Sequence, residues 1–384
     1  MSARLIALLV VALAPGAWAS DAFFATEVVD AVALPQAPSG VADPAWARVP
    51  GKAFTLAPQR TLRLNDKLAN EALAAPGVSE VLVRAAHVGP ALVVLLEWSD
   101  GAADLVRDDE VNTYADSAAV QVPVSFGPGL RLPAISMGDE AQPVRLWLQR
   151  ATKTGSQLSA LMAAGFGSST RQGPATPREG TMAWEAAARR WRAQFSVPLD
   201  AKAALVPMSF AVWDGARQER AGNKRLSSWR FVRVPGRTPD AAYVKAMAWG
   251  FSPGDLGDPQ KGKVLAEAVC VSCHHLPGRA IAPVGLAPSL VDIGVIATPG
   301  YLRESIVSPS EVVLYGPNPN QHYDKSQARD PNGAYPNNDG FRWFTVGADG
   351  KRTSKMPSFA GFSAEQLGDF VAYLKTLDGK GSTP

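Results

Sequence analysis

The sequence is organised around the stretch Cys270-Val271-Ser272-Cys273-His274, in which two cysteines three positions apart are followed directly by a histidine. This Cys-x-x-Cys-His pattern is the attachment signature of a c-type haem. On a helix, residues three positions apart share a face, so each thiol can add to one vinyl group of the same porphyrin. We therefore expect one covalent haem c, attached through Cys270 and Cys273, with His274 as an iron ligand.

Other uses of such a cysteine pair are a structural disulfide, a thioredoxin-like redox pair and half of a zinc site. The chain contains 2 cysteines, so the second cysteine pair that often completes a zinc site is absent. A redox Cys-x-x-Cys pair does not normally have a histidine directly after it. Haem attachment is the interpretation that uses both thiols and the imidazole of the motif.

The chain begins with the features of a secretory signal peptide. Arg4 precedes the apolar run Leu5–Ala14, and Ala17-Trp18-Ala19 offers a cleavage site of the small-x-small form. This arrangement predicts a signal peptide over residues 1–19, cut near Ala19. The apolar run is too short to span a membrane, and no later stretch reaches that length without charge. We expect an exported protein without a membrane span, which in a bacterium resides in the periplasm.

Composition and charge exclude some classes of function. The 384 residues are 46% hydrophobic and 19% charged, enough for two or three ordinary globular domains. A formal net charge of +3 and the lack of a Lys/Arg run argue against nucleic-acid binding. No phosphate-binding loop, nucleophile–base set or pair of catalytic carboxylates stands out, so the sequence does not indicate an enzyme.

The first half of the chain has the pattern of short strands. The clearest hairpin joins residues 80–86 to residues 91–98 through Gly89-Pro90. Residues 191–199 alternate, with the odd positions apolar, as a strand with one buried face does. Gly155–Glu179 is rich in Gly, Ser, Thr and Pro and is expected to be a loop. Further strands are expected at 117–124, 144–148, 208–213 and 227–234. Many short strands separated by turn residues predict an antiparallel β-sandwich.

Two groups of short motifs follow one another in this half. Ile135–Asp139 precedes Pro143–Trp147, and Phe210–Gly215 precedes Glu219-Arg220 and Lys224–Trp229. In this order the motifs resemble the b-haem domain of ethylbenzene dehydrogenase-type proteins. Those domains are the γ subunits of periplasmic molybdenum enzymes of the dimethylsulfoxide reductase family.

The resemblance implies a β-sandwich that holds one non-covalent haem b between a methionine and a lysine, which by position are Met137 and Lys224 here. A thioether is a soft, neutral ligand that raises the reduction potential of iron. A lysine, with an ordinary pKa of about 10.4, must lose its proton to bind iron, which requires an apolar site. By residue type alone, Met137 would be a core methionine and Lys224 a solvated one. His87 is the rival iron ligand in this half.

The second half begins after a linker predicted at residues 251–257, which separates domains at 20–250 and 258–384. Asp258 and Pro259 have the types expected at the start of a helix, which continues into the haem motif. Near the carboxy terminus, Ser363 and Gln366 form a capping-box pattern. Apolar residues then recur at helical spacing, at positions 367, 370, 371, 374 and 377.

This second half resembles class I cytochromes c. Beside the haem motif, the resemblance rests on Pro277–Arg279, Ala287–Leu290, Gly300–Ile306 and Lys355–Phe359. It implies an all-α domain in which Met356 is the sixth iron ligand of haem c and the last helix crosses the first. The segment from Glu311 to Lys355 is longer than in a minimal cytochrome c, and its His322 is the alternative sixth ligand.

Together the resemblances imply an electron-transfer subunit rather than an enzyme. Two six-coordinate haems leave no open iron position for a substrate. The γ subunits of nitrite oxidoreductases are similar in combining b and c haems. The implied partners are a catalytic molybdopterin subunit, an iron–sulfur subunit and a soluble cytochrome c or similar carrier. Two alternatives remain open: a free-standing dihaem carrier, and a haem-free β-sandwich binding module fused to a cytochrome c.

Overall fold

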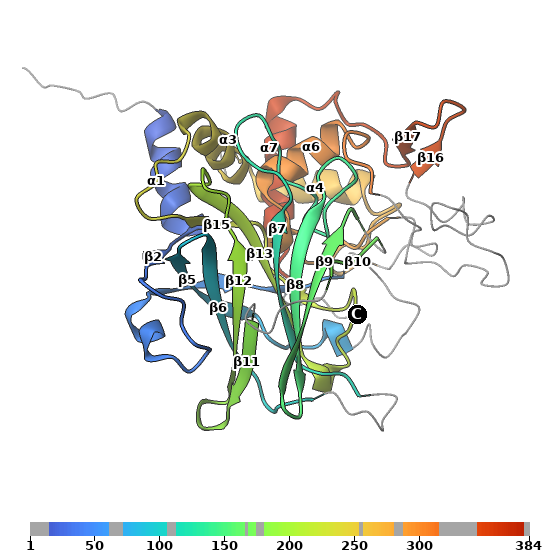
Figure 1. The fold of residues 1–384 in the computed structure, drawn as a ribbon. Helices are drawn as coiled ribbons and strands as arrows, with labels where there is room; N and C mark the ends of the chain where they lie inside the picture. Colours follow the sequence, from blue (N-terminus) through green and yellow to red (C-terminus); the bar gives the residue numbers. More distant parts are fainter. Residues whose placement is uncertain are drawn as a thin grey trace, which may run out of the picture.

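The computed structural model describes residues 15–60, 72–105, 113–165, 168–173, 180–252, 256–279, 287–314 and 344–379. These residues form a β-sandwich followed by a helical domain that lies toward one end of it (Figure 1). The predicted fold class, a β-sandwich followed by an all-α cytochrome c-like domain, is confirmed, with one short hairpin added to the helical domain. No helix in these segments is both long and apolar enough to cross a membrane.

The sandwich consists of two sheets. Its strands are β1 (Val28–Asp30), β2 (Val32–Ala33), β3 (Gly51–Thr55), β4 (Ala57–Pro58), β5 (Glu80–Val88), β6 (Ala91–Ser99), β7 (Ser117–Pro123), β8 (Val144–Thr152), β9 (Gly155–Ala163), β10 (Thr170–Arg171), β11 (Gly180–Glu185), β12 (Arg190–Pro198), β13 (Leu205–Trp213), β14 (Arg225–Leu226) and β15 (Arg230–Arg233). Among them, the larger sheet has the order β1-β15-β13-β7-β8-β9-β10, with β14 pairing both β13 and β4. The smaller sheet has the order β11-β12-β6-β5-β2, with β3 also on β5. Pairs β1–β15 and β2–β5 are parallel, which departs from the fully antiparallel arrangement expected.

The main hydrophobic core fills the space between the two sheets. Alternate side chains of a strand point to the same face, so each strand contributes every second residue. The odd-numbered residues 191–197 of β12 lie in this core, as the alternation predicted. The even-numbered residues 206–212 of β13 meet them from the larger sheet. This packing places the intervening residues of β13 on the outer face of the larger sheet.

The hairpin prediction is correct, and the loop prediction for Gly155–Glu179 is partly wrong. The hairpin is confirmed, because β5 and β6 pair antiparallel around Gly89, whose φ of 54° suits glycine. The loop expected over Gly155–Glu179 is wrong in its first part, where residues 155–163 form β9 beside β8. Leu158 and Ala160 of β9 pack against the main core. This tertiary contact offsets the low strand propensity of the glycine and serines.

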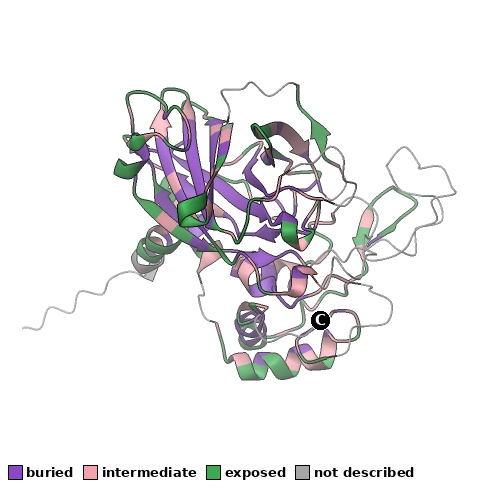
Figure 2. Cartoon of the chain, turned by 90° about the horizontal axis from the view of Figure 1, so that it is seen from below, coloured by how far each residue is buried: buried purple, intermediate pink, exposed green. Residues whose placement is uncertain are grey.

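Strands β7 and β13 are buried along their whole length, which means that both of their faces are covered (Figure 2). The outward-facing residues Ala119, Ala211 and Trp213 of these strands belong to one apolar cluster, and a second cluster lies on the outer face of β8 and β9. The Trp213 cluster consists of Ala57, Ala119, Ala211, Trp213, Leu226 and Ile296, and the Trp229 cluster consists of Val144, Leu146, Ala163 and Trp229. Because Ile296 comes from the helical domain, that domain covers part of the outer face of the larger sheet.

Two helices pack together beside the sandwich and against β15. Helix α1 (Pro15–Glu27) and helix α3 (Ala241–Phe251) lie side by side (Figure 1). Phe23 of α1 makes edge-to-face contacts with Phe231 (5.0 Å between ring centroids) and Phe251 (5.8 Å). The sequence analysis did not predict α3. The proposed cleavage site near Ala19 falls within α1, and residues 1–14 of the predicted signal peptide lie outside the described residues.

The short 3-10 helices of the sandwich are η1 (Pro44–Arg48), η2 (Ala186–Ala188) and η3 (Gly215–Arg217). The helical domain contains α4 (Pro259–Val269), α5 (Ile293–Ile296), α6 (Pro299–Val307) and α7 (Ala364–Lys375), with a hairpin of β16 (Phe344–Val346) and β17 (Arg352–Ser354). The Asp258 side chain caps α4 by accepting from Gln260 N, as predicted. Helices α4 and α7 cross at Gly262, where a Cβ atom would lie 1.9 Å from the carbonyl oxygen of Asp369. The expected crossing of the first and last helices is therefore present.

The capping box predicted at α7 is present and gives a stability test. Gln366 N donates to Ser363 Oγ (3.1 Å), and the Gln366 side chain accepts from Ser363 N (3.0 Å). Ser363→Ala should lower the free energy of unfolding by about 1 kcal/mol, measured by denaturant unfolding followed by circular dichroism. Ser363→Asp keeps a hydrogen-bond acceptor at the N-cap, so its free energy of unfolding should fall much less. Equal losses in both variants would show that the cap does not contribute.

Candidate haem sites

The Cys-x-x-Cys-His motif continues the helical turn at the end of α4. Cys270 is the C-cap of α4, and its carbonyl accepts from the backbone N–H groups of Cys273 (3.0 Å) and His274 (2.8 Å). Both cysteines are free thiols. Burial raises the pKa of the Cys270 thiol to about 12, so it stays protonated at neutral pH. The pair is thus left available for thioether formation on one helical face, as the haem interpretation requires.

His274 is oriented by a hydrogen bond that leaves one ring nitrogen available for iron. Its Nδ1 lies 2.7 Å from the carbonyl oxygen of Pro288. A carbonyl can only accept, so Nδ1 carries the proton and Nε2 keeps its lone pair. Burial lowers the pKa of His274, which favours the neutral imidazole that metals bind. Metal-binding histidines commonly use their second nitrogen in this way. The sequence analysis used residues 287–290 as part of the resemblance to cytochromes c but did not identify the role of Pro288.

Met356, the predicted sixth ligand of haem c, packs half-buried against the hydrophobic cluster that contains Cys270. Its loop is fixed at both ends. Met356 N donates to Ser354 Oγ (3.1 Å), and Phe359 N donates to the carbonyl of Ile306 in α6 (2.9 Å). The arrangement suits a distal ligand loop. The alternative ligand His322 lies outside the described residues, so the choice between the two stays a prediction.

Met137, the first predicted ligand of haem b, lies in a turn held in an unusual conformation. Its φ is 74°, a left-handed value that is uncommon for residues other than glycine and costs about 1–2 kcal/mol. The buried Asp139 carboxylate stabilises the turn by accepting from Ala134 N (3.0 Å) and from the Arg131 guanidinium (2.6 and 2.9 Å). The Met137 side chain packs against the Trp229 cluster. Strain that the surroundings enforce is typical of a functional position.

Lys224, the second predicted ligand, is buried rather than solvated. Its side chain is 5% exposed, and Nζ lies 5.6 Å from the ring centroid of Trp213. Burial lowers its pKa to about 8. The next residue, Arg225, does have an ion-pair partner, the buried carboxylate of Glu219 at 2.9 Å. No hydrogen bond or ion pair of Lys224 Nζ is found among the described residues, so its lone pair can be offered to iron.

Two buried amides accompany Lys224. Gln59 is fully buried, and its backbone N–H donates to the Lys224 carbonyl (2.8 Å). Asn223, the preceding residue, is 1% exposed. The side-chain amide groups of both have no hydrogen-bond partner within the described segments. A buried polar group without a partner costs about 1–3 kcal/mol. These side chains therefore fit a site that receives a further polar group, such as the propionates of haem b.

The two predicted ligands reach the same face of the sandwich. Lys224 lies over a member of the Trp213 cluster, Met137 packs on the Trp229 cluster, and Ile135 packs against both clusters. All of these lie on the outer face of the larger sheet. His87 does not share that face, because it belongs to β5 of the smaller sheet, where it is half-buried. The residues present fit a haem b held by Met137 and Lys224 better than one held by His87.

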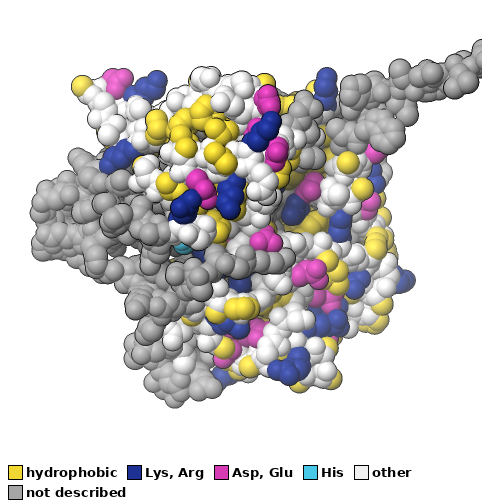
Figure 3. Space-filling view, turned by 180° about the vertical axis from the view of Figure 1, so that it is seen from behind, with side chains coloured by type: hydrophobic (Ala, Val, Ile, Leu, Met, Phe, Trp, Pro, Cys, Tyr) yellow, Lys and Arg dark blue, Asp and Glu magenta, His cyan; other side chains and the backbone are white. Residues whose placement is uncertain are grey.

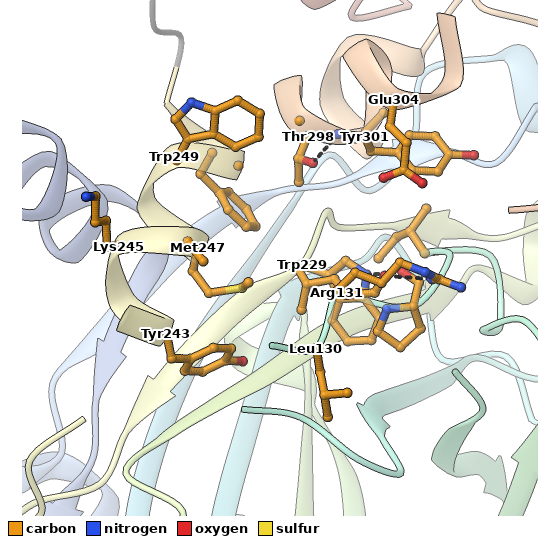
Figure 4. Close-up of a pocket in the computed structure, with 18 of the residues that line it drawn as sticks. Leu130, Arg131, Trp229, Tyr243, Lys245, Met247, Trp249, Thr298, Tyr301 and Glu304 are labelled. Atoms are coloured by element: carbon orange, nitrogen blue, oxygen red, sulfur yellow. Dashed lines mark hydrogen bonds between the residues drawn. The ribbon is translucent and has the colours of Figure 1, made fainter. Parts of the chain in front are cut away.

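A cavity of about 650 Å³ lies between the sandwich and the helical domain (Figure 4). Its walls come from residues 129–135, α3 and α6, together with Trp229 and Ile296. Tyr243, Met247 and Trp249 of α3 are drawn on one side of it and Tyr301 and Glu304 of α6 on another. Ile135 lines the cavity, which connects it to both outer clusters. Met137 and Lys224 are not among the described lining residues.

Comparison with known proteins supports both halves of this description. The chain is 31% identical over 182 residues to a protein described as a respiratory nitrate reductase heme subunit of Haloferax mediterranei, covering 45% of this chain and 62% of the relative. It is 34% identical over 157 residues to the chlorate reductase subunit gamma of Ideonella dechloratans, covering 38% of this chain and 62% of that relative. It is 27% identical over 245 residues to the dimethylsulfide dehydrogenase subunit gamma of Rhodovulum sulfidophilum, covering 56% of this chain and 83% of that relative. The alignments thus span 62% of the length of the first two relatives.

The family model named Cytochrome c matches residues 259–378, which coincide with the helical domain. Among solved structures, a family 9 carbohydrate binding module from Caldicellulosiruptor kristjanssonii in complex with cellotriose superposes with a TM-score of 0.31 at 10% identity, covering 56% of this chain and 97% of that one. So loose a superposition carries no argument about ligands. The sequence comparisons confirm the resemblances to γ subunits and to cytochrome c.

The thioether assignment is tested by removing one thiol. Cys273→Ser should prevent complete attachment, so that haem staining after denaturing electrophoresis is lost or strongly reduced and the pyridine haemochrome band shifts. Ser272→Ala is the matched control within the same turn and should stain normally. A normal covalent haem in Cys273→Ser would contradict the assignment.

The lysine assignment predicts a pH dependence of haem b binding. Because a proton and iron compete for the same lone pair, affinity of the haem b-depleted protein for haem should rise about tenfold per pH unit below pH 8 and level off above it, given the pKa of about 8 for Lys224. The lowered pKa also makes the unfolded chain bind more protons between that value and 10.5, so the stability of the haem b-free fold should rise with pH in this window. Spectroscopic haem titration at several pH values measures the affinity.

Lys224→Gln should abolish both the binding and its pH dependence. Lys202→Gln, at an exposed lysine of the same domain, should leave the profile unchanged. An affinity that is flat between pH 6 and 8 in the unaltered protein would exclude Lys224 as an iron ligand.

Proposed function

We propose that this chain, which joins a sandwich related to γ subunits to a cytochrome c domain, is a dihaem electron-transfer subunit of an exported molybdenum oxidoreductase complex. It carries one covalent haem c on Cys270 and Cys273 and one non-covalent haem b. The axial ligands are His274 and Met356 for haem c, and Met137 and Lys224 for haem b. Its role is transfer of electrons rather than catalysis.

One observation supports this proposal: in each half of the chain a nitrogen-bearing side chain at a predicted ligand position, Lys224 or His274, is buried. In the helical domain, the hydrogen bond to Pro288 fixes the tautomer of His274. In the sandwich, Lys224 is desolvated beside Trp213 with no competing partner among the described residues. A haem bound at either site supplies a one-electron iron couple. The protein residues close both coordination spheres and exclude water from them.

The partners follow from the relatives. Three relatives carry names of subunits of nitrate reductase, chlorate reductase and dimethylsulfide dehydrogenase. We assign this chain a catalytic molybdopterin subunit and an iron–sulfur subunit as partners within its complex, and a soluble cytochrome c or similar carrier outside it. The face seen in Figure 3 has intermixed acidic and basic side chains without a basic stripe, which suits protein partners better than nucleic acid.

The test is purification of the protein from its native source, with its haems and its partners identified. We expect one haem b that acidified acetone extracts, one haem c that stays with the protein, and co-elution with molybdenum and iron–sulfur subunits. Met137→Ala should lose the extractable haem and keep the covalent one. Met162→Ala, at a half-buried methionine of β9, is the matched control and should keep both.

The outcomes separate the alternatives. Both haems without any co-eluting subunit would replace the subunit assignment with a free-standing dihaem carrier. Covalent haem alone would overturn the haem b site and favour a haem-free binding module fused to a cytochrome c. Full retention of haem b in Met137→Ala would exclude Met137 as its ligand.

A further inference from the structure

We infer that the cytochrome c domain forms one wall of the haem b site, through α5, so that haem b retention depends on docking of that domain. The inference rests on the proposed function, because it presupposes that haem b binds at Met137 and Lys224. It goes further by assigning residues of the carboxy-terminal domain to a site whose predicted ligands lie in the amino-terminal domain.

Apolar contact is the first support. Ile296, the last residue of α5, is 1% exposed and belongs to the Trp213 cluster, against which Val295 also packs. Trp213 is the ring over which Lys224 Nζ lies. One short helix of the cytochrome domain therefore closes the apolar surroundings of a predicted haem b ligand. Ile296 also lines the interdomain cavity, as do residues from the segment 129–135, which precedes Met137 in the chain.

A buried ion pair is the second support. Arg60 Nε of the sandwich lies 3.1 Å from Asp292 Oδ2, the N-cap residue of α5, and the two side chains are 15% and 3% exposed. Arg60 directly follows Gln59, one of the two buried amides beside Lys224. Breaking a buried pair by removing one charge is strongly unfavourable, whereas removing both charges is much less so. The pair therefore fixes α5 to the part of the sandwich that contains Lys224.

Hydrogen bonds within the cytochrome domain hold α5 in a fixed position. Lys375 of α7 donates from Nζ to the carbonyl oxygens of Gly294 and Ala297, the latter at 2.8 Å. Gly294 N donates in turn to the Leu377 carbonyl (2.9 Å). A Cβ atom at Gly294 would lie 2.6 Å from the carbonyls of Leu374 and Lys375, so only glycine allows this close approach. α5 is thus a fixed part of the domain rather than a loose loop.

The same segment also supports haem c. Pro288, whose carbonyl orients His274, lies four residues before Asp292, and Leu290 N donates to the His275 carbonyl (3.0 Å). Residues 288–296 therefore contact the histidine side of the haem c site at one end and the lysine side of the haem b site at the other. This arrangement places the two sites on either side of one short, rigid segment.

The test introduces a charge into this contact in the full-length protein. Ile296→Asp should weaken retention of extractable haem b by at least about tenfold, because an unpaired carboxylate is disfavoured among apolar side chains. Covalent haem c should be unaffected, which also reports that the cytochrome domain has folded. Val264→Asp, at a 68% exposed position of α4, is the matched control and should keep both haems. Pyridine haemochrome ratios and spectroscopic haem titration measure the result.

A second set of variants tests the ion pair without adding charge. Asp292→Asn should weaken haem b retention and shift the reduction potential of haem b, and Arg60→Gln combined with Asp292→Asn should restore part of the loss. Normal haem b affinity and potential in both Ile296→Asp and Asp292→Asn would show that α5 is not a wall of the site. Absence of haem b from the unaltered protein would overturn the proposed function as well, which distinguishes the two failures.

Discussion

The desolvation of Lys224 is the constraint on which the amino-terminal site depends. An ammonium group loses the solvation of water when it is buried, and among the described residues the Trp213 ring is the group found to offset that loss. The lowered pKa of about 8 is the measurable consequence. The next residue along the chain, Arg225, does have a carboxylate partner, because it pairs with Glu219 at 2.9 Å. A lysine to which the described residues offer no counter-ion, while its neighbour receives one, loses its proton more easily than a solvated lysine.

The cytochrome domain solves the corresponding problem by different means. Its haem is expected to be covalently attached, so the pocket does not need buried polar groups that hold the haem by hydrogen bonds. The close crossing of α4 and α7 at Gly262 sets the start and end of the domain against each other. Pro288 then fixes the tautomer of His274 through a single backbone carbonyl. In contrast, Gln59 and Asn223 beside Lys224 have no side-chain partners within the described segments, as suits a cofactor bound only by non-covalent contacts.

Local sequence patterns predict much of this arrangement. The haem motif, the caps at Asp258 and Ser363 and the alternation of β12 each depend on residues close together in the chain, and each is confirmed as local structure. Strand β9 was missed because its glycine and serines have low strand propensity and only packing reveals it. The Pro288 carbonyl, the Arg60–Asp292 pair and the docking of Ile296 could not be predicted, because they join residues by tertiary contact without any type-specific pattern.

Strands β7 and β13 of the larger sheet are buried on both faces, which explains why a second domain packs on this sheet. A sandwich strand normally needs apolar side chains only toward the core, yet the outward residues of β7 and β13 are buried as well, and apart from Gln121 they are apolar or small. Such strands require a cover, and α5 provides part of it through Ile296. The small side chains of Ala119 and Ala211 leave little bulk of their own on this face. A flat cofactor between the sheet and the covering domain would therefore be enclosed by both domains, so the covering domain would contribute to the proposed haem b site as well as to electron transfer.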